Sequence, residues 1–179
     1  RALDPAQPAG TQIEVHYAVL PAMARRKAAD PVFFFAGGPG QSAIDLAGVL
    51  SKRYARFSHR RDLVFVDQRG TGRSAPLKCA DDSDRPPLEP LAHATDEVRR
   101  MQRIQECLSA LKALPHGDLR QYTTTQAMQD VEAVRAHLGY TQWNLIGASY
   151  GTRAALEYQR QFPSSVRRTV LDGVAPADM

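Results

Sequence analysis

Apolar and polar positions follow two different rhythms along the 179-residue chain. Residues 12–20 place apolar side chains at every second position, which is typical of a strand with one buried face. Short apolar runs predict four further strands, and the continuous runs among them suit a sheet that is buried on both faces. These four strands are expected at residues 32–36, 63–67, 143–146 and 168–172.

Helices are predicted between these strands. The two longest carry apolar side chains at every third or fourth position, and Thr123 and Gln126 have the spacing of a capping box. The helices are expected at residues 42–52, 95–114, 123–138 and 152–162. Strands that alternate with helices predict an α/β fold, with a mainly parallel sheet and helices on both faces.

Length and charge narrow the class of protein. The chain is long enough for one domain and hardly for two. Residues 75–122 are expected to form a surface excursion and one helix, because residues 75–90 hold four prolines and four acidic residues. The 23 Lys and Arg side chains, against 19 Asp and Glu, are scattered, which argues against a nucleic-acid partner. The longest apolar stretch, residues 32–36, is too short to span a membrane.

The strongest chemical signal is the pattern Gly-x-Ser-x-Gly, formed by Gly147, Ser149 and Gly151. A predicted strand precedes this pattern and a predicted helix follows it, which is the setting of a nucleophile elbow. The glycines permit a strained turn and close approach of neighbouring elements, and the helix N-terminus favours negative charge. Ser149 is therefore the candidate nucleophile. The alternative is a plain strand-to-helix turn with a buried serine.

A second glycine-rich loop consists of Gly37, Gly38, Pro39 and Gly40, after the first continuous apolar run. An oxyanion hole needs backbone N–H donors aimed at the developing charge. One normally belongs to the residue after the nucleophile, here Tyr150, and the other to a loop after an earlier strand. We expect the N–H groups of Gly38 and Tyr150 to fill these roles. Taken alone, the tetrapeptide would indicate only a turn.

A third glycine-rich segment begins at Asp67. Gly70, Gly72 and Ala75 loosely fit a dinucleotide fingerprint, but that fingerprint must open a helix. A proline-rich stretch follows here instead, so neither a nucleotide nor another cofactor is expected. Asp67 and Arg69 are expected to brace the oxyanion loop through charged hydrogen bonds.

Together, in this order and spacing, the three motifs resemble the proline iminopeptidase family of α/β-hydrolases. They are AGGPG at residues 36–40, DQRGTGRS at 67–74 and GASYG at 147–151. The first residues and the segments at Cys79 and Cys107 look more like the tripeptidyl aminopeptidase branch, and the resemblance covers nearly the whole chain. Two positions depart from the family. Ala36 stands where members often have histidine, and Tyr150 stands where the iminopeptidases proper usually carry tryptophan, which weakens strict proline specificity.

The resemblance implies a serine exopeptidase that releases proline or short peptides from substrates with a free N-terminus, through an acyl-enzyme on Ser149. It also implies a periplasmic or secreted protein in which Cys79 and Cys107 form a disulfide. From the residues alone, two cysteines do not establish a bond, and no second pair gives the spacing of a metal site. Two rivals remain: a carboxylesterase-type α/β-hydrolase, since a fold does not fix the substrate, and an incomplete hydrolase domain used for binding.

The chain carries no histidine after Ser149, although the triad of this fold runs in the order Ser, Asp or Glu, His. We therefore expect residues 1–179 to be the N-terminal part of a single α/β-hydrolase domain, with a sheet that is incomplete on its C-terminal side. The acid and the base are expected on the remaining C-terminal part of the hydrolase. Asp172, at the end of the last predicted strand, is interpreted as a structural turn residue.

Overall fold

The computed structural model of the chain describes residues 1–79 and 96–176. Its centre is a five-stranded sheet with the strand order β1–β3–β2–β4–β5. β1 is antiparallel to β3, and the other neighbouring strands pair in parallel. The strands are β1 (Tyr17–Leu20), β2 (Val32–Phe35), β3 (Leu63–Val66), β4 (Trp143–Ala148) and β5 (Val166–Asp172). The prediction of a mainly parallel sheet is confirmed.

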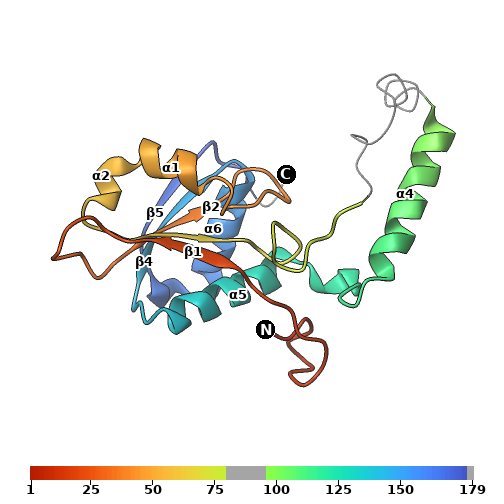
Figure 1. The fold of residues 1–179 in the computed structure, drawn as a ribbon, viewed down its shortest axis with the longest axis horizontal. Coiled ribbons are helices and arrows are strands. Elements are labelled where there is room, and N and C mark those ends of the chain that lie inside the picture. Colours follow the sequence, from red (N-terminus) through yellow and green to blue (C-terminus); the bar gives the residue numbers. More distant parts are fainter. Residues whose placement is uncertain (80–95, 177–179) are drawn as a thin grey trace.

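Helices lie on both faces of the sheet, as predicted (Figure 1). On one face are α1 and α2, and on the other are α5 and α6, which also pack against each other. The bounds are α1 (Ala47–Arg53), α2 (Ala55–Ser58), α4 (Glu97–Lys112), α5 (Thr124–His137) and α6 (Tyr150–Gln161). Two short 3-10 turns, η2 (Leu119–Gln121) and η3 (Pro163–Ser165), precede α5 and β5.

The central strand β2 supplies side chains to both faces. Phe33 and Phe35 belong to the hydrophobic cluster beneath α5 and α6, whereas Val32 and Phe34 belong to the cluster beneath α1. All four are at most 4% exposed, which explains why the run is continuously apolar. Because β2 and β4 are parallel neighbours, the loops after them meet at the same edge of the sheet.

The first predicted strand is shorter than its alternating pattern. Residues 12–20 were expected to be extended into one strand, but β1 begins at Tyr17. The N–H of His16 donates to the Ser74 hydroxyl at 2.9 Å instead of to a neighbouring strand. The residues before His16 bond to the N-terminal segment. The alternating pattern therefore reflects local burial beyond the strand itself.

The first predicted helix also starts late. Its expected range was 42–52, but α1 begins at Ala47. The carboxylate of Asp67 accepts hydrogen bonds from the Ser42 hydroxyl at 2.7 Å and from the Ile44 N–H at 3.2 Å. These bonds hold the preceding residues in turns and delay the helix.

α4 extends away from the sheet (Figure 1), and none of its residues is buried. It begins after Asp96, whose carboxylate accepts the N–H groups of Val98 and Arg99. Its apolar stripe, including Met101 and Ile104, is exposed. Most of the excursion predicted at residues 75–90 lies outside the described residues. In α5, by contrast, the predicted cap is confirmed, since the Thr123 hydroxyl accepts the Gln126 N–H.

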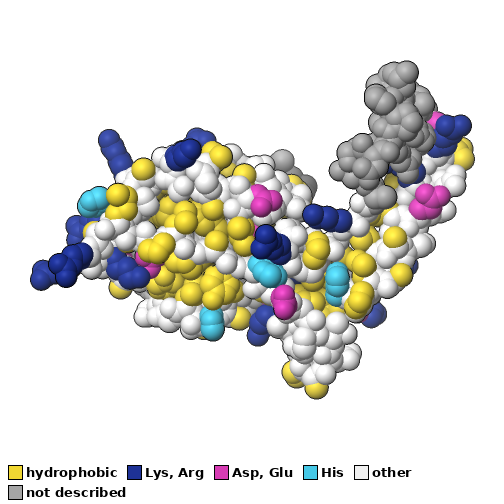
Figure 2. Space-filling view, viewed as in Figure 1, with side chains coloured by type: hydrophobic (Ala, Val, Ile, Leu, Met, Phe, Trp, Pro, Cys, Tyr) yellow, Lys and Arg dark blue, Asp and Glu magenta, His cyan; other side chains and the backbone are white. Residues whose placement is uncertain are grey.

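Charged side chains are spread over the face of the molecule that Figure 2 draws. On the face in Figure 2, Lys and Arg lie at several separate places, with hydrophobic side chains exposed between them. No helix within residues 1–79 and 96–176 has both the length and the hydropathy that a membrane crossing requires.

Candidate active site

The turn between β4 and α6 gives Ser149 an unusual backbone conformation. Its φ is 49° and its ψ is −120°, and the residue is exposed at the N-terminus of α6. Positive φ is uncommon for a residue with a Cβ, and such strain is found where surrounding structure enforces it, often at functional sites. A positive φ at the serine of a strand–turn–helix with this glycine pattern is typical of a nucleophile elbow.

Close packing explains the two glycines that flank Ser149. A Cβ built on Gly147 would lie 2.4 Å from the carbonyl oxygen of Gly151. A Cβ on Gly151 would lie 2.5 Å from the carbonyl oxygen of Phe35 and 2.8 Å from that of Ala36. All three distances are below normal contact, so Gly147 is needed for the close turn onto Gly151, and Gly151 for the approach of α6 to the end of β2.

Hydrogen bonds fix the turn from the side of β5. The Ser149 N–H donates to the carbonyl oxygen of Asp172 at 2.9 Å. The Thr152 hydroxyl donates to the carbonyl oxygen of Ser149 at 2.6 Å and accepts the Ala175 N–H at 2.9 Å. Asp172 is exposed and contributes its backbone to the turn, which agrees with its interpretation as a structural residue.

The glycine loop after β2 lies against the elbow. Tyr150, the first residue of α6, donates its N–H to the carbonyl oxygen of Gly37 at 3.1 Å. Gly38 donates its N–H to Oε1 of Gln41, also at 3.1 Å. The loop turns through Pro39 and through Gly40, whose φ is +81°. The structure thus brings the two expected oxyanion donors to one edge of the sheet, each already bonded to an oxygen of the loop.

Asp67 lies at the end of β3 and is 1% exposed. Besides its bonds to Ser42 and Ile44, its carboxylate accepts the Arg73 N–H at 3.2 Å. Gly72 packs against this carboxylate so tightly that a Cβ there would lie 1.9 Å from Oδ2. Asp67 therefore joins the segment after the glycine loop to the turn after β3.

Arg69 is buried as well, and its bonds run in a different direction from the one expected. It forms an ion pair with Asp130 of α5, with Nε–Oδ2 at 2.7 Å and Nη2–Oδ1 at 2.9 Å. Its Nη1 donates to the carbonyl oxygens of Leu3 and Gln121, both at 2.8 Å. Arg69 thus joins the N-terminal segment, η2 and α5, and its side chain makes no hydrogen bond to residues 37–40.

A cavity of about 280 Å³ lies beside the candidate oxyanion donors. Its lining includes Gly38, Gln41, Tyr150, Tyr122 and Thr124. The Tyr150 hydroxyl lies 2.9 Å from the Thr124 hydroxyl, so α5 fixes the ring of the residue after the nucleophile. Burial raises the pKa of the Tyr122 phenol, while the charge of Arg69 opposes that rise. Sequence reasoning missed Gln41 and Thr124, because neither belongs to a recognised motif.

No histidine makes a hydrogen bond with the Ser149 side chain within the part of the chain that the structure describes. His59 follows α2, and His137 ends α5. His16 lies beside β1, three strands from β4 in the sheet order. His116 contacts the carbonyl oxygen of Pro76. None of these four makes a hydrogen bond with the Ser149 side chain, and His93 lies outside the described residues.

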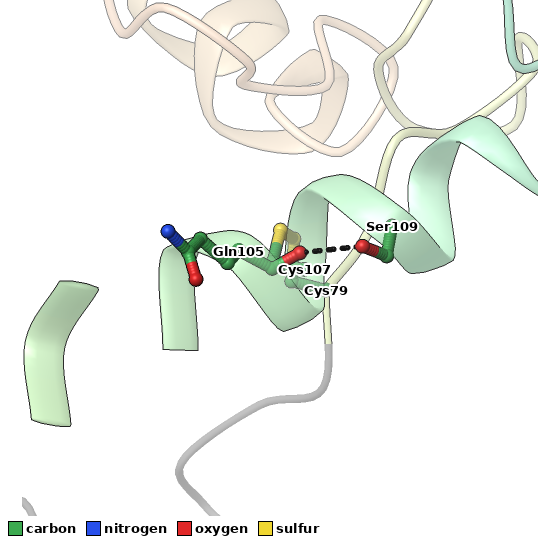
Figure 3. The surroundings of a disulfide bond; sticks show 4 residues. All are labelled: Cys79, Gln105, Cys107 and Ser109. Carbon is green, nitrogen blue, oxygen red and sulfur yellow. Dashed lines mark hydrogen bonds between the residues drawn. A yellow bond between two sulfur atoms is a disulfide. The ribbon is translucent and has the colours of Figure 1, made fainter. Parts of the chain in front are cut away.

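A disulfide joins Cys79 to Cys107 of α4 (Figure 3), with the Cα atoms 5.3 Å apart. Near it, the hydroxyl of Ser109 donates to the backbone oxygen of Gln105 at 2.8 Å (Figure 3). The Cys79–Cys107 disulfide connects the exposed helix α4 to the segment that follows the third glycine-rich turn. Over residues 1–79 and 96–176, no three His, Cys, Asp or Glu side chains cluster in a way that could hold a metal ion.

Sequence comparison defines the class of protein to which this fold and turn belong. The profile of a family described as "alpha/beta hydrolase fold" matches residues 30–179. The chain therefore belongs to the α/β-hydrolase family, in which the strand–Ser149–helix turn is the expected place of the nucleophile.

Named relatives are hydrolases and peptidases. Serine protease Hip1 of Mycobacterium tuberculosis is 34% identical over 149 residues, which cover 76% of this chain and 28% of the relative. The tripeptidyl aminopeptidase of Streptomyces coelicolor is 33% identical over 150 residues, 77% of this chain and 27% of the relative. The proline iminopeptidase of Neisseria meningitidis is 28% identical over 145 residues, 80% of this chain and 32% of the relative. The chain thus spans less than a third of each of these relatives.

Solved structures share the fold at low sequence identity. A marine microorganism esterase gives a TM-score of 0.53 at 14% identity, covering 92% of this chain and 43% of that one. MGS-M2, an α/β hydrolase from a deep-sea metagenome library, gives a TM-score of 0.53 at 15% identity, covering 90% of this chain and 41% of that one. These likenesses support the architecture alone.

Proposed function

We propose that the chain carries the nucleophile of a serine hydrolase, and that Ser149 is that nucleophile. The observation that carries the proposal is the backbone of Ser149, held at positive φ and exposed between a buried strand and a helix. In the proposed reaction the Ser149 oxygen attacks the scissile carbonyl and forms an acyl-enzyme. The backbone N–H groups of Gly38 and Tyr150 stabilise the oxyanion.

Other residues of the three glycine-rich segments act as supports. Gly147 permits the close turn onto α6, Gly151 lets α6 approach the end of β2, and Gly37, Pro39 and Gly40 shape the loop that carries the Gly38 donor. Asp67 holds the segment after this loop through Ser42 and Ile44. Arg69 supports α5, whose Thr124 contacts the Tyr150 ring hydroxyl. Each support acts on the position of a donor or of the nucleophile.

The acid and base of the triad are proposed to come from a C-terminal part of the same hydrolase, outside residues 1–179. Two observations support this: none of the four described histidines makes a hydrogen bond with Ser149, and the matched relatives are more than three times as long as the aligned region. Residues 1–179 would then be the N-terminal part of one hydrolase domain. The base would take the proton of Ser149 and later return it to the leaving amine.

The proposed substrate is a peptide with a free N-terminus, from which proline or a short peptide is released. The relatives named tripeptidyl aminopeptidase and proline iminopeptidase support this choice. A periplasmic or secreted location is proposed with it. The Cys79–Cys107 disulfide supports that location, since disulfides persist in oxidising compartments.

The exopeptidase proposal is tested on the complete protein with three matched substrates. They are a tripeptidyl aryl amide with a free N-terminus, its N-acetylated form, and a simple aryl ester. We expect acetylation to lower kcat/KM by at least about a hundredfold, because a site built to bind an ammonium group rejects an analogue that lacks it. Equal turnover of both amides would contradict exopeptidase action. Turnover of the ester alone would identify an esterase.

A further inference from the structure

Both candidate oxyanion donors are already used in this structure. The Tyr150 N–H donates to the carbonyl oxygen of Gly37, and the Gly38 N–H donates to Oε1 of Gln41, each at 3.1 Å. An oxyanion hole works only when its donors point together at the developing charge. The loop as it stands therefore does not present an open hole.

One peptide unit accounts for both bonds. The carbonyl of Gly37 and the N–H of Gly38 belong to the same planar trans peptide, so they point in opposite directions. While the carbonyl faces the Tyr150 N–H, the Gly38 N–H must face away from it, toward Gln41. Rotating this single peptide unit would withdraw the carbonyl and turn the Gly38 N–H to the side of the Tyr150 N–H.

We propose that Gln41 is a positioning residue that holds the oxyanion hole closed at rest, through its hydrogen bond to the Gly38 N–H. The hole opens when the Gly37–Gly38 peptide rotates and Gln41 releases that N–H. This inference rests on the proposed function, because it assigns the regulation of the oxyanion hole that serves Ser149. Gln41 is exposed and borders the cavity beside Tyr150, so its side chain has room to move away.

The glycine at position 38 supports the rotation. In the closed loop its φ lies outside the positive range, and a Cβ there would meet Gln41 at 3.4 Å, an ordinary contact. The closed conformation therefore does not itself require glycine. Rotation of the preceding peptide unit changes φ at residue 38 by a large angle, and glycine alone enters such conformations without steric cost.

The chemistry favours opening at the moment it is needed. The Gln41 carboxamide and the Gly37 carbonyl are neutral acceptors, whereas the oxyanion carries charge and binds N–H donors about twice as strongly. Replacing the Gln41 and Gly37 oxygens by a substrate oxygen as acceptor of the two N–H groups is therefore unfavourable with a ground-state carbonyl. The same replacement is favourable with the tetrahedral intermediate. Interactions that strengthen only in the transition state accelerate the chemical step.

The first test reads the closing bond without relying on catalysis. In the complete protein, Gln41→Met removes the acceptor while keeping the side-chain length, and Gln41→Ala removes the whole side chain. Both should move the Gly38 amide proton resonance upfield, as expected for a lost hydrogen bond. Gln105→Met, on the exposed helix α4, is the matched control and should leave that resonance in place. An unmoved resonance in both Gln41 variants would overturn the inference.

The second test measures the consequence for Ser149. A fluorophosphonate labels an activated serine at a measurable second-order rate, and a peptidyl boronate binds as a tetrahedral anion in the oxyanion hole. Gln41→Met should raise both the labelling rate and the boronate affinity by about two- to tenfold, the value of one neutral hydrogen bond. KM for the peptide substrate should stay unchanged. Gln41→Glu keeps a hydrogen-bond acceptor, so its labelling rate and boronate affinity should not exceed those of the wild type.

The outcomes separate the two proposals. Normal labelling of Ser149 with no gain in Gln41→Met would overturn the role of Gln41 and leave the nucleophile in place. Absence of labelling in the wild type would overturn the proposed function, and the regulatory role of Gln41 with it, even if the Gly38 resonance moves.

Discussion

The backbone N–H of Ser149 donates to the carbonyl oxygen of Asp172 at 2.9 Å. This bond joins the candidate nucleophile to the last residue of β5, the strand next to β4. On the other side, Gly151 lies against the carbonyl oxygens at the end of β2. The elbow is therefore held between two strands, and its strain is balanced by contacts on both sides.

The strain at Ser149 predicts a trade between stability and activity. Replacing Ser149 by glycine should raise the free energy of unfolding by about 1 kcal/mol, because glycine adopts positive φ without the steric cost that other residues bear. Urea unfolding measures this difference. Ser149→Ala is the matched control: it removes the same hydroxyl, keeps the Cβ and should bring no gain. A gain of the same size in both variants would contradict backbone strain as the cause.

The approach of α6 to β2 predicts a steep cost at Gly151. Gly151→Ala should lower the free energy of unfolding by about 1–3 kcal/mol, since its Cβ would overlap two backbone oxygens that cannot move alone. Gly48→Ala in α1 is the control, because nothing lies within 4 Å of its added Cβ. That variant should be neutral or stabilising by up to about 1 kcal/mol. Thermal or urea unfolding measures the stability of both variants. An equal change in the free energy of unfolding in the two would refute the packing argument.

The buried Arg69–Asp130 ion pair predicts a large loss of stability when Arg69 alone is replaced, and a partial recovery when both residues are replaced. Both side chains are 1% exposed, so Arg69→Met should cost about 3–5 kcal/mol by leaving a buried carboxylate without its main partner. In the double variant Arg69→Met/Asp130→Leu no charge stays buried, and part of the stability should return. Equilibrium unfolding of the two variants decides this. A double variant as unstable as the single one would show that the cost comes instead from the lost hydrogen bonds of Arg69 to the carbonyl oxygens of Leu3 and Gln121.

Asp30 predicts a loss of stability in acid. Its burial raises the pKa, but hydrogen bonds from Asn144, Arg61 and Arg167 outweigh that effect and lower the pKa to about 2, from 3.8. A carboxyl with a depressed pKa stabilises the fold above its unfolded pKa and loses that contribution as the pH falls toward the folded pKa. The stabilising contribution of Asp30 is therefore lost as the pH falls from about 4 to about 2.

The test compares urea unfolding at pH 5 and pH 3. The wild type should lose about 1 kcal/mol more over this interval than Asp30→Asn does. Asp45→Asn is the control, because the Asp45 carboxylate makes no hydrogen bond among the described residues. Its pH dependence should match that of the wild type. Identical pH dependence in the wild type and Asp30→Asn would contradict the assignment.

The sequence was informative wherever a local pattern determined the structure. The continuous runs predicted β2, β3 and β4 to within one or two residues, because strands buried on both faces need apolar side chains at every position. The glycine spacing around Ser149 predicted the elbow for a similar reason. There, steric exclusion of a Cβ leaves a visible trace in the sequence.

Long-range contacts were not predictable from local pattern. Arg69 pairs with Asp130, 61 residues away, and no spacing in the sequence marks these two as partners. Asp67 captures Ser42 and Ile44 and thereby shortens a helix that apolar periodicity favoured. Gln41 lies immediately after a recognised motif, yet its bond to Gly38 depends on the orientation of one peptide unit, which the sequence does not record.

The central claim is that Ser149 is an activated nucleophile, and covalent labelling tests it most directly. Trypsin releases residues 136–153 as one peptide, in which Ser149 is the sole serine. After treatment of the complete protein with a fluorophosphonate, mass spectrometry should find the phosphonyl adduct on this peptide, with fluoride as the leaving group. The Ser149→Ala variant should carry no adduct there. An unlabelled wild-type peptide would contradict the account and favour a hydrolase domain used for binding.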